Sequence, residues 1–279
     1  MSSISFDKQI KARMASGFPE KGALGGAWRG KSYEHILKVR SREDLIWEYN
    51  VLPAVRQIDS KEGRLLKGAQ LHQCAHHLNS SQILCYNFFR PLLLAKDKGA
   101  VPKPELSSLL LEGCGVTLSE NAQCEFESAS RFHDRTNFDL YINDDNGTEV
   151  FFEIKYTEQH FGNGKNDPRH NDKFLKTYLP LIGHCSAIDK KAASDPKIFF
   201  RHYQLFRNTL GITGSNKYTL FIYPADNFSL AREAKLFKDS FLTGPDAANV
   251  HFLTWEEMTS LLPDSQHKNE FINKYLGYK

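Results

Sequence analysis

The chain has 279 residues, of which 41% are hydrophobic and 25% charged, and its formal net charge is +3 at pH 7. This composition is typical of a folded globular protein and excludes a wholly disordered chain, and no apolar run is long enough to cross a membrane. The N-terminus lacks the apolar stretch of a secretory signal, and the five cysteines include no CxxC pair. We therefore expect a cytoplasmic protein without a disulfide framework or a zinc knuckle.

The N-terminal part, 1–65, is expected to be a basic, loop-rich elaboration with short helices, followed by one domain over 66–279. Residues 1–40 hold eight Lys or Arg against three Asp or Glu. Such a local positive excess can attract phosphate, although a solvated arm without a ligand explains the same charges equally well.

Apolar spacing and turn residues predict the remaining elements. Helices are expected over 65–95, with a break at Asn79–Ser81 where a serine caps the second helix, and over 105–111. Three strands should follow, with a tight turn at 144–147 between the second and third. The predicted strands are 123–128, 137–143, 149–157, 217–223 and 250–254, and the later helices are 171–184, 197–209, 229–240, 255–262 and 268–276. Helices, a meander and helix–strand units indicate an α/β fold.

Charged side chains interrupt two of these apolar strands. Alternation places Glu153 and Lys155 on one face, and the turn at 144–147 should bring Asp139 opposite Glu153 or one pair away. Two carboxylates are oxygen ligands of the kind that Mg²⁺ or Mn²⁺ prefers, and the backbone carbonyl of Ile154 could add a third. Lys155 would then orient or deprotonate a water, a division of roles that suits phosphodiester hydrolysis.

The order Asp139, then Glu153-Ile154-Lys155, resembles the D…(D/E)xK signature of the PD-(D/E)xK nuclease superfamily. Four segments in sequence are similar to a bacterial restriction-endonuclease-like family within it: 80–92, 136–142, 152–162 and 203–208. The resemblance spans about 70–225. It implies a restriction-endonuclease-like core of helix, three-stranded meander, helix and strand, with helical N- and C-terminal elaborations, divalent-metal dependence and DNA as the substrate.

Many superfamily members add a carboxylate from the first core helix, but residues 70–95 contain no Asp or Glu. Glu127 or Glu125 of the first strand could replace it, and we prefer Glu127. Some members carry a glutamine on the helix after the ExK strand, where this chain has Gln204, and Gln82 is a further polar candidate. Each of these four residues could equally be an ordinary strand or helix residue.

Residues 25–32, GGAWRGKS, fit the phosphate-binding pattern GxxxxGK[ST]. A nucleotide-dependent enzyme is therefore an alternative, although the apolar strand that should precede the glycines is missing. A basic loop that contacts DNA phosphates through Arg29 and Lys31 explains the segment better. A second basic stretch beyond the ExK strand predicts further DNA contacts at Lys165, Arg169 and Lys173.

Together these features predict a Mg²⁺-dependent deoxyribonuclease, endonucleolytic and active in restriction, defence or repair. A catalytically inactive DNA-binding or scaffold protein on the same fold is the main alternative. A homodimer is expected if the protein cuts both strands, since one site serves one strand.

Overall fold

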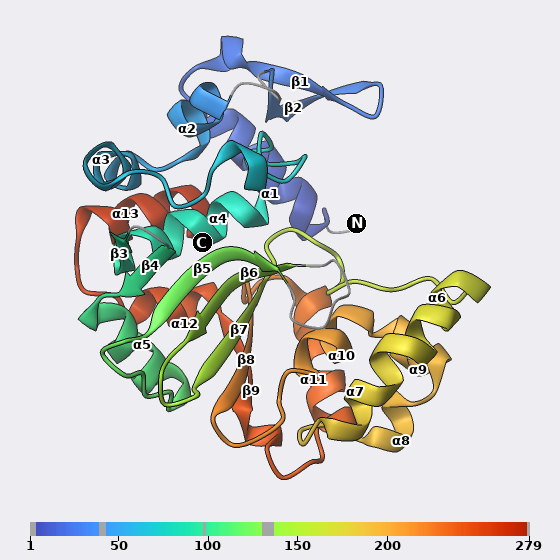
Figure 1. Ribbon diagram of the computed structural model, residues 1–279. Coiled ribbons are helices and arrows are strands. Elements are labelled where there is room, and N and C mark those ends of the chain that lie inside the picture. Colours follow the sequence, from blue (N-terminus) through green and yellow to red (C-terminus); the bar gives the residue numbers. More distant parts are fainter. Residues whose placement is uncertain (1–3, 39–42, 97–98, 130–136, 278–279) are drawn as a thin grey trace.

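A seven-stranded sheet forms the centre of the protein, with its strands in the order β3-β4-β5-β6-β7-β8-β9. The computed structural model describes residues 4–38, 43–96, 99–129 and 137–277 (Figure 1). Strands β3 to β7 are antiparallel, whereas β7, β8 and β9 are parallel. The strands are β3 (Leu93–Lys96), β4 (Gly99–Pro102), β5 (Gln123–Ala129), β6 (Asn137–Asn143), β7 (Glu149–Ile154), β8 (Lys217–Tyr223) and β9 (Val250–Thr254).

The turn between β6 and β7 is built by Asp144, as its sequence predicts. The Asp144 carboxylate accepts hydrogen bonds from the backbone N–H groups of Asn146 at 3.0 Å and Thr148 at 2.8 Å. Gly147 takes a φ of 79°, which is unfavourable for a residue with a Cβ atom. The turn therefore fixes the register of β6 against β7.

Both faces of the sheet are covered, which explains the nearly continuous apolar sequences of β7 and β8. On one face, helix α4 (Ser81–Phe89) lies buried beside α5 (Pro104–Cys114), α12 (Trp255–Ser260) and α13 (Gln266–Phe271). The hydroxyl of Ser80 caps α4 by accepting from the Ile83 N–H, as predicted. The other face is covered by α6 (Pro168–Lys173), α7 (Leu179–His184), α8 (Lys190–Ala193), α9 (Pro196–Arg201), α10 (Tyr203–Thr209) and α11 (Phe228–Phe241). The expected α/β class and the core order of helix, meander, helix and strand are confirmed.

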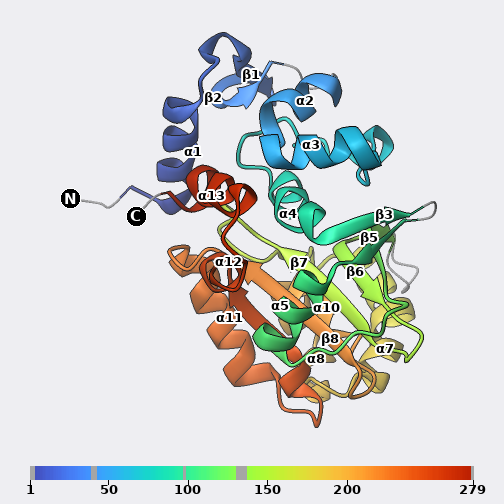
Figure 2. The ribbon, with the colours of Figure 1, turned by 90° about the vertical axis from the view of Figure 1, so that its left-hand side faces the viewer.

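The N-terminal part contains more regular structure than the predicted loop-rich arm. It forms α1 (Phe6–Gly17), a hairpin of β1 (Leu24–Trp28) and β2 (Lys31–Leu37), α2 (Glu43–Asn50) and α3 (Pro53–Glu62). Figures 1 and 2 show these elements stacked on the end of the molecule where α4 and α13 lie. The division at 65/66 stays a prediction.

A buried ion pair connects α3 to the 3₁₀ turn Arg90–Leu92, which directly follows α4. Arg90, which is fully buried, donates from Nε to Asp59 Oδ1 at 2.9 Å. The Tyr86 hydroxyl and the Trp47 indole N–H also donate to Asp59, each at 2.8 Å. Side chains from both sides of position 65 therefore share one hydrogen-bonded core.

The phosphate-binding-loop alternative for 25–32 is wrong. These residues lie in the β1–β2 hairpin, in which Trp28 pairs with Lys31 across a two-residue turn. Arg29 and Gly30 both have positive φ, 49° and 79°, as a tight hairpin turn requires. A phosphate-binding loop needs a helix directly after the glycines, and here a strand follows.

Three further elements differ from the sequence prediction. Residues 65–79 form turns and a short 3₁₀ helix at Gly68–Gln70 rather than a helix, and the β3–β4 hairpin was not predicted. The predicted helix over 197–209 is interrupted at His202, between α9 and α10. Among the described residues, no helix is both long and apolar enough to span a bilayer.

Candidate active site

Three neighbouring strands bring three carboxylates into one line across the sheet. The pairing registers of β5 with β6 and of β6 with β7 place Asp139 between Glu127 and Glu153. We call these three residues the carboxylate rung. The sequence predicted the proximity of Asp139 and Glu153 from the turn, and the register of β5 brings Glu127, the preferred candidate for a further carboxylate, beside Asp139.

Glu127 has an unusual backbone, with a φ of 50°. The left-handed region is unfavourable for a residue with a Cβ atom and persists only where the surroundings fix it. The Glu127 carboxylate accepts from Gln82 Nε2 at 2.8 Å, and Gln82 Oε1 in turn accepts from the backbone N–H of His72 at 2.8 Å. Gln82 therefore holds Glu127 in place. Glu125, the other candidate, is exposed and accepts from Ser128 Oγ.

Glu153 and Lys155 lie at the end of β7 and are 5% and 8% exposed. Lys155 Nζ is 2.7 Å from Glu153 Oε1 and donates to Gln204 Oε1 at 2.9 Å. The backbone of Lys155 is also fixed, because its N–H donates to Ile222 and its carbonyl accepts from the Trp255 indole. The structure therefore brings Gln204, a candidate from the sequence, into contact with Lys155.

Together, burial and the neighbouring charges raise the pKa values of Asp139, Glu127 and Lys155. Burial, and then the nearby carboxylates of Glu153 and Glu127, raise the pKa of Asp139 well above its usual value. Burial also raises the pKa of Glu127. For Lys155, burial alone would lower the pKa, but the surrounding carboxylates, Glu153 first, raise it above its usual range. Lys155 therefore carries its proton at neutral pH and can act as a hydrogen-bond donor.

Two site residues on α10 were not singled out by the sequence. Asn208 is fully buried, and its amide nitrogen donates to Glu153 Oε2. The side-chain oxygen of Asn208 accepts from Arg207 Nη1, and the Arg207 guanidinium lies 4.8 Å from the centre of the Phe138 ring. The spacing of four between Gln204 and Asn208 places both on one helix face, a signal that could have identified Asn208.

Gly162 fits closely against Gln204. The backbone N–H of Gln204 donates to the Gly162 carbonyl at 3.2 Å. A Cβ atom at Gly162 would lie 2.2 Å from Gln204 Oε1, and the glycine has a φ of 135°. No other residue type can occupy this position without displacing Gln204.

The basic residues that follow β7 gather beside the site. Lys165, Arg169 and Lys173 line a pocket of about 690 Å³ together with Phe200 and Tyr203. Tyr203 directly precedes Gln204, so α10 contributes residues both to this pocket and to the candidate site. The other two basic residues predicted to contact DNA are exposed on the β1–β2 turn, at the top of Figure 1, and do not line this pocket: Arg29 and Lys31.

The residues of the rung fit a hard divalent cation. Within the described ranges, no three His, Cys, Asp or Glu side chains are grouped so that they could hold a metal by themselves. Mg²⁺ does not need such a group, because it keeps several waters and binds through one or two carboxylates. Burial and then the carboxylates of Glu153 and Glu127 raise the pKa of Asp139, and a cation would offset this negative charge.

Comparison with known proteins identifies the family. A family model described as "Restriction Endonuclease associating with ARP" matches residues 19–276, a wider range than the predicted resemblance over 70–225. Neither the curated proteins nor the solved structures yield a match. The family match includes the carboxylate rung, Lys155, Gln204 and most of the N- and C-terminal elaborations. The chain therefore belongs to the restriction-endonuclease-like family "Restriction Endonuclease associating with ARP".

Proposed function

We propose that the protein is a metal-dependent nuclease that hydrolyses phosphodiester bonds in DNA. The observation that supports this proposal is the carboxylate rung, with Lys155 fixed beside it, in a chain of a restriction-endonuclease-like family. Asp139, Glu153 and the carbonyl of Ile154 would hold Mg²⁺ or Mn²⁺. The bound ion would lower the pKa of a water and offset the charge that builds on the phosphate.

The protein's own residues have distinct parts in this proposal. The Lys155 ammonium donates a hydrogen bond to the attacking water or to a phosphate oxygen, and Gln204 orients that ammonium. Asn208 fixes the Glu153 carboxylate from the opposite side. Glu127, whose pKa is raised by burial, would accept the proton that the water loses.

DNA would be held next to this centre by the basic pocket. Lys165, Arg169 and Lys173 can contact backbone phosphates, and Phe200 and Tyr203 provide aromatic walls. The affinity for DNA should then fall steeply with salt. The family description also names ARP as an associate of these endonucleases, so we propose that this chain works together with ARP. The homodimer, the cytoplasmic location and the role in defence or repair stay predictions.

Cleavage of supercoiled plasmid, with and without Mg²⁺ or Mn²⁺, tests this function. Wild type should nick the plasmid only with metal, and Lys155→Ala and Asp139→Ala should each lower the rate by at least about a hundredfold. Lys217→Ala is the matched control, because Lys217 pairs with Glu149 at the opposite end of β7. A wild-type protein that cleaves neither plasmid, linear nor single-stranded DNA with either metal would support the inactive DNA-binding alternative instead.

A further inference from the structure

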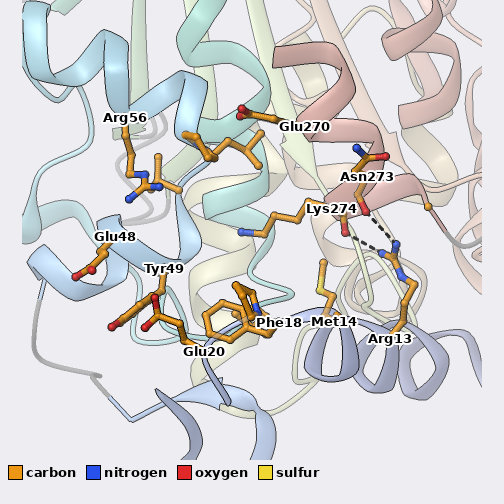
Figure 3. Close-up of a pocket in the computed structure, with 17 residues that line it drawn as sticks. Arg13, Met14, Phe18, Glu20, Glu48, Tyr49, Arg56, Glu270, Asn273 and Lys274 are labelled. Carbon is orange, nitrogen blue, oxygen red and sulfur yellow. Dashed lines mark hydrogen bonds between the residues drawn. The ribbon is translucent and has the colours of Figure 1, made fainter. Parts of the chain in front are cut away.

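A second pocket lies where the N-terminal and C-terminal helices meet (Figure 3). Its volume is about 670 Å³, and it is lined by α1, α2, the start of α3, and α13 with the π-helical turn Ile272–Leu276 that follows it. Small-molecule sites have volumes of roughly 300–1,000 Å³. Of the described residues that line this pocket, none belongs to the proposed nuclease site.

Two cationic side chains from different elements point into this pocket. Figure 3 shows Lys274 extending into the cavity and Arg56 approaching from α3. Lys274 Nζ donates to Asn50 Oδ1 at 2.9 Å and to the Asn50 carbonyl. The Nε atom of Arg56 is buried and makes no hydrogen bond within the described residues. Burial and then Arg56 lower the pKa of Lys274 to about 7. Among the described residues, neither Lys274 nor Arg56 forms an ion pair, although three carboxylates also line the pocket.

Two of the carboxylates around the pocket are committed to other partners. Glu270 accepts from the Ala54 N–H at 2.9 Å and from Gln266 at 2.7 Å, which fixes it at the start of α3. The nearby carboxylate of Glu20 raises the pKa of the Tyr49 hydroxyl. Together with Glu48 they line the pocket, but among the described residues none of the three forms an ion pair with Lys274 or Arg56.

The remainder of the pocket wall is largely apolar. Its apolar lining includes Met14, Phe18, Leu52 and Leu78. The Phe18 ring also contacts Tyr49, with ring centres 5.9 Å apart. An apolar wall with a few convergent polar groups is the usual composition of a small-molecule site.

We propose that this pocket binds a small organic anion, whose charged group pairs with Lys274 and Arg56 and whose apolar body lies against Met14, Phe18 and Leu52. The chemistry suits either a carboxylate or a phosphate attached to an aromatic body. Both would pair with the two cations and bury apolar surface. The site is separate from the proposed nuclease centre and does not depend on it.

Anion binding should depend on pH in a defined direction. Lys274 is charged below its pKa of about 7, so binding should tighten as pH falls through that value and should raise the pKa in the complex. The other charged or titratable residues around the pocket come from α1, α2, α3, α13 and the connection after α1: Arg13, Glu48, Tyr49, Arg56, Glu270 and Glu20. None of these is a histidine, so Lys274 is the group expected to titrate near neutral pH.

Fluorescence titration with the aromatic anion anilinonaphthalene sulfonate tests the proposal on the full chain. Wild type should bind the dye saturably, and more tightly one pH unit below the Lys274 pKa than one unit above it. Lys274→Met and Arg56→Met should each weaken binding by at least about tenfold, because each removes a charge-assisted contact. Lys235→Met is the matched control, since Lys235 is exposed on α11 and pairs with Asp239.

Competition identifies the kind of anion. Displacement of the dye by AMP but not benzoate would indicate a nucleotide-like phosphate, and the reverse would indicate an aromatic carboxylate. Inorganic phosphate, which lacks an apolar body, should compete less well than the better of the two. The proposal is overturned if wild type binds no dye saturably, if neither compound displaces it, or if folded Arg56→Met binds it like wild type. Circular dichroism shows whether each variant is folded. If Lys274→Met does not fold, the result for Arg56→Met decides the test.

Discussion

Replacing Asn208 by alanine should both destabilise the protein and slow cleavage. Asn208 connects the Glu153 carboxylate to the Arg207 guanidinium, and all three side chains are buried. A hydrogen bond to a charged group contributes about 1.5–3 kcal/mol. The variant loses two such bonds, but they share one residue and are not additive. We therefore expect the free energy of unfolding to fall by about 3–4 kcal/mol.

Urea denaturation followed by circular dichroism measures this loss, with Asn121→Ala as the matched control. Asn121 is exposed and hydrogen-bonds to Asp145, so its removal should change the free energy of unfolding by less than about 0.5 kcal/mol. The cleavage rate of Asn208→Ala should also fall, because Glu153 loses its anchor. A destabilisation below about 1 kcal/mol, or one equal to that of the control, would refute the role assigned to Asn208.

Three further predictions concern the site and its support. Burial and neighbouring carboxylates raise the pKa of Asp139, so the native state of the metal-free protein holds that proton more tightly than the unfolded state. The free energy of unfolding of the metal-free protein should therefore fall as pH rises above the ordinary pKa of aspartate. Asp139→Asn should flatten this pH dependence in urea denaturation, and an unchanged slope would contradict the assignment. Gly162→Ala should slow single-turnover cleavage by roughly tenfold to a hundredfold with DNA affinity unchanged, since a Cβ atom would displace Gln204; a wild-type rate would show that Gln204 is dispensable. Arg90→Met should lower the free energy of unfolding by about 3–5 kcal/mol, because Asp59 stays buried without its counter-ion, and a loss below about 1 kcal/mol would argue against that pair.

The centre of the site could be predicted because local rules determine it. A tight turn at 144–147 fixes the pairing of two strands, and alternation then determines which side chains share a face. Asp139, Glu153 and Lys155 follow from those two rules alone. Gln204 could be proposed only through the family resemblance.

The rest of the site depends on contacts between segments that are distant in the sequence. Glu127 joins the rung through the register of β5 against β6, which no turn sequence specified, and Gln82 reaches Glu127 from α4. Asn208 contacts Glu153 only after α10 packs on the sheet. The sequence around each of these residues does not show that they meet, and they come together only when the segments pack in the folded protein.

The N-terminal part shows that a short sequence pattern typical of a phosphate-binding loop can also occur in a β-hairpin. The letters GGAWRGKS satisfy a phosphate-binding pattern, yet the backbone at Arg29 and Gly30 forms a hairpin turn. All four residues of β2 from Lys31 to Glu34 are exposed, so the strand lacks the clear alternation that would have predicted it. Helices α1 and α3 were missed because few of their residues are buried.

Metal binding at the carboxylate rung is the most direct test of the central claim. Isothermal titration calorimetry with Mg²⁺ should show binding to wild type that is lost in Asp139→Asn and in Glu153→Gln. Glu125→Gln is the matched control, because this exposed carboxylate lies on β5 outside the rung, and it should bind Mg²⁺ like wild type. Binding that persists unchanged in both rung variants, or that is absent from a wild type that still cleaves DNA, would contradict the account.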